Sequence, residues 1–192
     1  MSIKIVDEAA LETDVEYRFR YVKDFIGLTS ADVEAIRESS QSLRDKMPQL
    51  ADSLLMKLLE SDESMRVFVP TDAARNVRKS ANEQKLTLEH PRVLEIRRNI
   101  IDFLTELVSG NYDDAAFARK LDEIGAAHAV PDRSGTKVPM MQINAMMGFL
   151  SDRLMTKVRT LGLPHDREIA LITALQKLIW IQMNMMVRHY VR

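Results

Sequence analysis

The fold class is decided by the C-terminal stretch DREIALITALQKLIWIQMNMMVRHYVR, residues 166–192. It contains neither glycine nor proline, and its apolar residues return every three or four positions, which is the period of an α-helix. One apolar stripe is Ile169, Ile172, Gln176, Ile179, Met183 and Met186, and a second stripe beside it is Leu171, Leu175, Leu178 and Gln182. A helix that is apolar over so much of its girth is buried on more than one side.

The second buried side of this helix can be covered by the rest of the chain or by another subunit. Eight of the 12 methionines stand at or after Met140, and such adaptable side chains suit both a core and an interface between helices. The residues alone leave both interpretations open. Because the chain is small, we favour a homodimer that pairs through the last two long helices.

The same period predicts helices along most of the chain. We expect them at residues 16–26, 29–46, 48–59, 90–109, 113–129, 139–161 and 166–192, with a short helical turn at residues 65–68. Residues 71–84 are expected to form a polar helix or a loop, and residues 1–13 a flexible N-terminal arm. With only 6 glycines and 6 prolines to mark turns, we expect an all-α protein with a single domain over residues 14–192 rather than an all-β fold.

The composition excludes several classes of function. With 27 Lys+Arg against 28 Asp+Glu, the net charge of -1 gives no support for nucleic-acid binding. There is no cysteine, no apolar region of a signal peptide and no apolar run of 18 residues, so we expect a cytoplasmic protein without a membrane span. No phosphate loop, HExxH or GxSxG motif occurs, and charged residues such as Arg97 and Asp102 are expected on solvated helix faces. We therefore predict that the protein is not an enzyme.

Four histidines remain as candidates for chemistry. His90 precedes Pro91 at a helix start and His165 follows Pro164 in a turn, so both are expected to be exposed. His189 lies near the end of the chain, where a cation favours the C-terminal dipole of a helix. The positions of these three residues do not indicate a site.

His128 differs because it continues the apolar stripe of its helix, which is formed by Phe117, Leu121 and Ile124. Small neighbours such as Gly125 let another group approach this helix closely. A histidine on an apolar face is often a core residue with a hydrogen-bond partner, but the axial ligand of a haem iron has the same placement. The helical period does not choose between these two roles.

Several motifs together resemble one family in their order and spacing. They are Gly110-Asn111-Tyr112-Asp113-Asp114, then Ile124-Gly125-Ala126-Ala127-His128, then Val138-Pro139 at the start of a long helix. The stretch from Tyr21 to Thr29 and the last helix from Ala174 to Tyr190 are similar to the same family, so the resemblance covers about residues 15–191. This family is the globin domain of globin-coupled sensors and protoglobins.

The resemblance implies a globin-like fold with an extra N-terminal helix, and a haem b whose iron is bound by His128. Phe117, Leu121 and Ile124 would then contact the haem on the same side. The resemblance also implies a diatomic gas as ligand, a homodimer through the last two long helices, and a signal that passes to an output domain or a partner protein.

Two departures from the family pattern concern the gas-binding side. Leu55 stands where members commonly have a tyrosine that donates a hydrogen bond to dioxygen, and Ile96 and Ile100 on the other wall are also aliphatic. A hydrogen bond stabilises by about 0.5–1.5 kcal/mol and bound dioxygen is the more polar ligand, so we predict a pocket that favours carbon monoxide or nitric oxide. The polar stretch over residues 70–89 is longer than in the family, and we expect His90 after it to be exposed rather than a sixth iron ligand.

Two alternatives to the gas sensor stay open. One is a haem-free globin-fold module for signalling or protein interaction, in which His128 is a core residue. The other is a haem enzyme such as a nitric oxide dioxygenase, which ranks last because the aliphatic wall offers no acid or base. Haem content separates the first alternative from the sensor, and turnover with nitric oxide and dioxygen separates the second.

Overall fold

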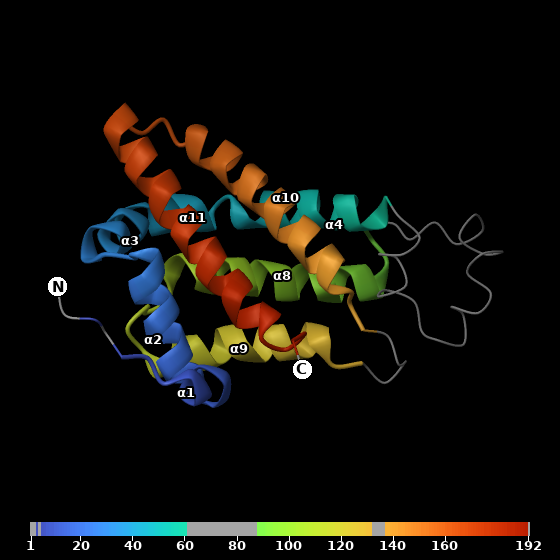
Figure 1. The fold of residues 1–192 in the computed structure, drawn as a ribbon. Coiled ribbons are helices and arrows are strands. Elements are labelled where there is room, and N and C mark those ends of the chain that lie inside the picture. Colours follow the sequence, from blue (N-terminus) through green and yellow to red (C-terminus); the bar gives the residue numbers. More distant parts are fainter. Residues whose placement is uncertain (1–2, 4, 61–87, 132–136, 192) are drawn as a thin grey trace.

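The computed structural model describes residues 3, 5–60, 88–131 and 137–191 (Figure 1). All regular structure in these ranges is helical, which confirms the predicted all-α class. The helices are α1 (Glu8–Thr13), α2 (Val15–Ile26), α3 (Ser30–Arg44), α4 (Met47–Leu59), α8 (Pro91–Ser109), α9 (Ala115–Ala129), α10 (Met140–Arg159) and α11 (His165–Val187). Apart from α1, which was not predicted, their bounds agree with the predicted ranges to within about five residues. The predictions for residues 65–68 and 71–84 lie outside the described residues.

Most of the fold is organised around α11. This helix packs against α2, α3, α9 and α10, while α8 packs against α3 and α4 (Figure 1). Its stripe with Leu171, Leu175 and Leu178 is buried throughout, whereas Ile169 at the start of the other stripe is 51% exposed and Ile179 is buried. Contact with several helices explains why apolar residues cover so much of the girth of α11.

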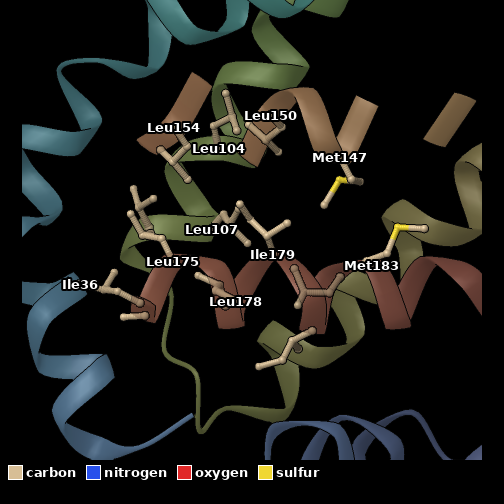
Figure 2. Packing of buried hydrophobic residues seen from close by; sticks show 14 of the residues in the cluster. Ile36, Leu104, Leu107, Met147, Leu150, Leu154, Leu175, Leu178, Ile179 and Met183 are labelled. Atoms are coloured by element: carbon tan, nitrogen blue, oxygen red, sulfur yellow. The ribbon is translucent and has the colours of Figure 1, made fainter. Parts of the chain in front are cut away.

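The main core takes side chains from α2, α3, α4, α8, α9, α10 and α11, and Figure 2 shows the part of it between α8, α10 and α11. The leucines of this part include Leu104 and Leu107 from α8, Leu150 and Leu154 from α10, and Leu175 and Leu178 from α11, each at most 2% exposed. Met147 of α10 and Met183 of α11 continue the same cluster. Burial of this many large side chains is the main source of stability and fixes the three helices relative to one another.

The apolar character of α11 also raises the question of a membrane. By length and composition alone, it is the one helix in the described ranges that could cross a bilayer, with a mean hydropathy of 1.3 over its most apolar window. Of that window, 56% is buried inside the protein. Packing against its four neighbouring helices accounts for this apolarity, as for the central helix of a helical core.

The N-terminal segment differs from the expected arm, because residues 8–13 form the short helix α1. The Asp7 side chain caps this helix by accepting a hydrogen bond from the Ala10 amide at 3.0 Å. Asp14 then ends α1 and caps α2 by accepting from the amides of Glu16 and Tyr17. The two capping residues mark the starts of α1 and α2, which hydrophobic periodicity does not reveal for α1. The two helices pack against each other.

A polar corner fixes α11 to the connection between α2 and α3. Gly27, with φ of 75°, ends α2 in the left-handed conformation that glycine adopts without strain. Asp32 and Thr29 then form a capping box at the start of α3, and Lys177 of α11 donates to Asp32 at 2.7 Å and to the Gly27 carbonyl at 2.9 Å. Burial alone would raise the pKa of Asp32, but hydrogen bonds from Lys177 and Thr29 outweigh it and hold the pKa below its usual value.

Candidate functional site

His128 lies in the last turn of α9 and is half-buried. Its Nδ1 is 2.7 Å from the carbonyl oxygen of Ile124, one turn earlier in the same helix. Because a carbonyl oxygen can only accept, Nδ1 is the donor in this contact, and in the neutral imidazole the lone pair then lies on Nε2. The imidazole is therefore oriented by its own helix, and its metal-binding nitrogen is left available.

Gly125 brings the His128 helix unusually close to α11. A Cβ atom at this position would lie 2.8 Å from the Cα of Met186 and 3.0 Å from the carbonyl oxygen of Met185, so no larger residue fits without moving one of the helices. The close approach expected from the small residues beside His128 is present, and α11 makes it. The position of His128 thus depends directly on how α9 packs on α11.

The predicted neighbours of His128 on α9 divide into two groups. Leu121 is buried two turns before His128, and Ile124 is half-buried one turn before it, on the same stripe. The ring of Phe117 instead packs edge-on against Phe19 at 5.9 Å, where α9 meets α2. Phe117 lies 11 residues before His128, or about 16 Å along the helix, so the structure places it in the core between α2 and α9 and away from the histidine.

The residues predicted for the gas-binding side do come together. Leu55 of α4 and Val93 of α8 are fully buried against each other, in a cluster separate from the main core. Five partly buried residues complete this aliphatic cluster: Leu58, Leu59, Leu88, Ile96 and Ile100. Sequence reasoning had singled out Leu55, Ile96 and Ile100. Val93 belonged to the same predicted stripe as Ile96 and could have been found from its spacing.

An ion pair flanks the aliphatic cluster, and its side chains remain partly exposed, at 30% for Arg97 and 37% for Asp52. The Arg97 guanidinium donates through Nε to Asp52 Oδ1 at 2.5 Å and through Nη2 to Asp52 Oδ2 at 3.1 Å. This hydrogen bonding raises the pKa of Arg97 above its ordinary value. The two-pronged contact fixes α8 to α4 beside Leu55 and Ile96.

The ends of α8 and α9 bring the two halves of the candidate site to one end of the molecule. The short connection over residues 110–114 makes α8 and α9 antiparallel neighbours, so the start of α8 and the end of α9 lie at the same end (Figure 1). Ile96 lies in the second turn of α8 and Ile100 at its middle, and His128 lies in the last turn of α9. An imidazole nitrogen that can bind a metal and an aliphatic cluster at the same end of the molecule are the groups that a haem site requires, so these residues fit haem.

Gln182 is the one fully buried polar residue among those described, at 0% exposure on α11. Neither its Nε2 nor its Oε1 has a hydrogen-bond partner within the described part of the chain. It lies between Ile179 and Met186, and thus one turn from the contact of α11 with Gly125. An unpaired buried amide costs about 1–3 kcal/mol, and an ordered water or a bound guest commonly satisfies such a group.

The other histidines are structural. His90 is exposed and caps α8 by accepting from the Arg92 amide at 3.2 Å, which confirms its predicted place at a helix start. His165 is the exposed first residue of α11. His189 is more than an end-of-helix cation, because its Nε2 lies 2.8 Å from Asp122 of α9.

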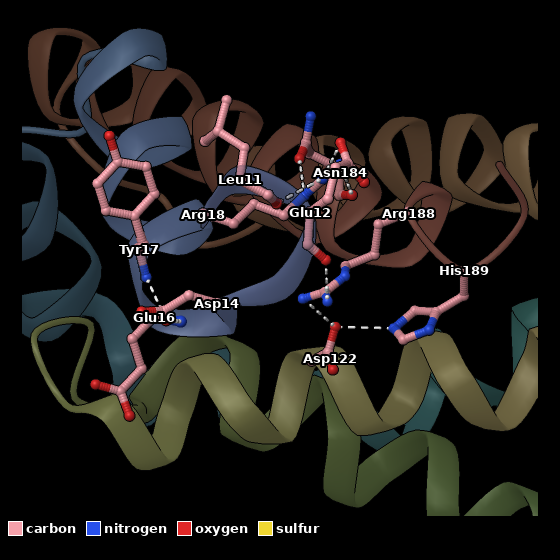
Figure 3. A network of polar contacts seen from close by, with 10 residues as sticks. All are labelled: Leu11, Glu12, Asp14, Glu16, Tyr17, Arg18, Asp122, Asn184, Arg188 and His189. Atoms are coloured by element: carbon pink, nitrogen blue, oxygen red, sulfur yellow. Dashed lines mark hydrogen bonds and ion pairs between the residues drawn. The ribbon is translucent and has the colours of Figure 1, made fainter. Parts of the chain in front are cut away.

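A polar junction formed by Arg18, Asp122, Asn184, Arg188 and His189 surrounds this last contact (Figure 3). Asp122 accepts from His189 and forms an ion pair with Arg188 at 3.2 Å. On α2, Arg18 donates to Asn184 at 3.0 Å, and burial lowers the pKa of Arg18. Sequence reasoning missed the junction because its members are far apart in the chain and are ordinary charged residues in every local pattern.

Comparisons with known proteins identify the fold and the family of the chain. The globin domain of the Geobacter sulfurreducens globin-coupled sensor has a similar structure, with a TM-score of 0.68 and 18% identity over 90% of this chain and 97% of that one. A likeness at this identity establishes the fold, so the predicted globin fold is confirmed. No curated protein matches the chain. The family model named Protoglobin matches residues 15–192, which is nearly the whole chain, and the protein therefore belongs to the Protoglobin family.

Proposed function

We propose that the protein binds haem b with His128 Nε2 as the iron ligand and acts as a sensor of a diatomic gas. The observation that carries the proposal is the 2.7 Å contact between His128 Nδ1 and the Ile124 carbonyl, which leaves Nε2 free to bind a metal. Membership of a globin family supports the choice of haem over a core role for His128. Haem would supply the iron that binds the gas, and Leu121 and Ile124 would exclude water around the histidine.

The proposed gas preference rests on the aliphatic cluster. Leu55, Ile96 and Ile100 carry no hydrogen-bond donor, so they cannot stabilise the partial negative charge that develops on bound dioxygen. Carbon monoxide and nitric oxide depend less on such a donor. We therefore expect the protein to bind these two gases in preference to dioxygen. The same lack of an acid or base supports binding rather than turnover.

The proposed homodimer uses the outer faces of the last two long helices. Large apolar side chains are exposed there, with Met141 of α10 at 64%, Ile169 of α11 at 51% and Trp180 of α11 at 62%. Ile169 and Trp180 are three turns apart on the same face of α11, and we infer that a second subunit covers this face. A signal would pass through this interface to an output domain or a partner protein.

The test is a haem titration of the purified protein followed by absorption spectroscopy, with His128→Ala beside it and His90→Ala as the matched control. His90 is an exposed helix cap, so its loss leaves the haem site intact. We expect the wild type and His90→Ala to give a sharp Soret band that shifts with carbon monoxide, and His128→Ala to lose it. Equal spectra of free haem in all three proteins would refute the proposal and favour the haem-free module.

A further inference from the structure

Two residues of the turn that follows α11 contact the His128 helix directly, and the third is joined to it through Val138. Arg188 and His189 both bind the Asp122 carboxylate, at 3.2 and 2.8 Å (Figure 3). The next residue, Tyr190, donates its hydroxyl proton to the Val138 carbonyl at 2.8 Å. The amide of Val138 in turn donates to the carbonyl of His128 at 3.2 Å. Two separate routes therefore join this turn to α9, one of them through the backbone of His128.

The first route is buried and strongly charged. The side chains of Asp122, Arg188 and His189 are only 17%, 10% and 12% exposed. Screening by solvent is weak at such exposure, so the positions of these groups are tightly coupled. If Asp122 moved away from the turn, the buried Arg188 guanidinium would keep its hydrogen bond to the Glu12 carbonyl but lose this ion pair, which is unfavourable.

The same turn also holds the N-terminal helix. Arg188 donates through Nη2 to the carbonyl of Glu12 at 3.0 Å, and Arg18 donates to the carbonyl of Leu11 at 3.2 Å. These carbonyls belong to the last turn of α1, where a helix has free acceptors and a negative dipole end. A displacement of Arg188 thus reaches α1 as well as α11.

His128 and Asp122 move together because they lie on one helix. They are six residues apart, or about 9 Å along α9, and the hydrogen bonds of the helix make this segment rigid. A pull on His128 Nε2 therefore displaces the Asp122 carboxylate and, through the His128 carbonyl, the Val138 amide. Both displacements arrive at the turn over residues 188–190.

We infer that the turn Arg188-His189-Tyr190 reads the position of the His128 helix, with Asp122 and Tyr190 as its two coupling residues. The inference rests on the proposed function, since the force on His128 is that of iron ligation. It assigns a role to a polar junction that neither binds the haem nor lines the aliphatic cluster. It also predicts that a change at His128 alters the last turn of α1 through Arg188.

The test is hydrogen exchange of the reduced, haem-loaded protein with and without carbon monoxide, read on peptides that cover residues 5–14 and 184–191. The variants are Asp122→Asn, which removes the charge, and Tyr190→Phe, which removes only the hydroxyl. The matched controls are Glu123→Gln, at the exposed neighbour of Asp122, and Tyr21→Phe, whose ring packs on Phe25. Absorption spectra recorded in parallel report whether His128 still binds the iron.

We expect carbon monoxide to change exchange at both peptides in the wild type and in the two controls. In both variants, carbon monoxide should no longer change the exchange of residues 184–191. In Asp122→Asn, it should also no longer change the exchange of residues 5–14. The Soret band should be retained in both variants. If both variants bind haem and still show the full change in exchange on adding carbon monoxide, the inference is overturned and the proposed function stands. A wild type that binds no haem overturns both. If Asp122→Asn does not fold, Tyr190→Phe alone decides the outcome.

Discussion

Replacing Gly125 by alanine tests whether the close packing of α9 on α11 positions His128. The new Cβ would lie 2.8 Å from the Cα of Met186, and ordinary carbon contacts are about 3.5–4.0 Å, so the helices must separate by roughly 0.7–1.2 Å. Overpacking of this kind costs about 1–3 kcal/mol. Replacing glycine by alanine inside a helix also stabilises that helix by about 1 kcal/mol, because glycine is a poor helix former, and this gain offsets part of the cost. We expect a net loss of up to about 2 kcal/mol, or a fall in Tm of up to roughly 8 °C for a chain of this size.

Gly148 provides the matched control for this experiment. It lies inside α10, and a Cβ there would have no atom within 4 Å. Gly148→Ala should therefore change stability only through the higher helix propensity of alanine. We expect it to stabilise the protein by about 1 kcal/mol and to raise Tm by roughly 2–4 °C. The difference between the two variants in thermal unfolding isolates the contact with α11. If Gly125→Ala melts at the temperature of Gly148→Ala, the contact is not the constraint that we describe.

Three further predictions follow from the site and its surroundings. Leu55→Tyr should slow dioxygen release by about threefold to tenfold in stopped-flow measurements on the haem-loaded protein, and an equal effect of Leu55→Phe would show that the hydroxyl is not responsible. Gln182→Leu should raise the unfolding free energy of the haem-free protein by about 1–3 kcal/mol in urea titrations, whereas Gln176→Leu, which loses a hydrogen bond to Ser151, should not. Because the folded protein lowers the pKa of Asp32, its carboxylate stabilises the protein above the unfolded pKa and this stability is lost as the pH falls through the folded pKa. The stability difference between the wild type and Asp32→Asn should thus be constant near neutral pH and shrink below about pH 4, and a difference that persists in acid would contradict this account.

The helices could be predicted from the sequence because each has its own local signals. Val93, Ile96 and Ile100 show the period of α8, and His90 with Pro91 marks its start. The exception is α1, whose signal is the Asp7 cap rather than a stripe of apolar residues. Hydrophobic spacing reports burial, and a helix of six residues held by its caps buries too little to show it.

The candidate site was predictable only where it follows from one helix or one family pattern. Leu121, Ile124 and His128 share a stripe on α9, and their spacing suffices to place them together. Phe117 has the same spacing, yet its ring packs toward α2, because a stripe is wide enough to face two neighbours. The pairing of Asp122 with His189 depends on how α9 crosses α11, and a sequence pattern contains no information on that crossing.

Trp180 gives the protein a natural optical probe of one surface. It is the only tryptophan in the chain and is 62% exposed on α11. Its indole already contacts water in the folded monomer, so unfolding should shift its emission spectrum little. A blue shift that grows with protein concentration would instead report that a second molecule has covered the outer face of α11. Fluorescence thus follows association in this protein, and circular dichroism follows folding.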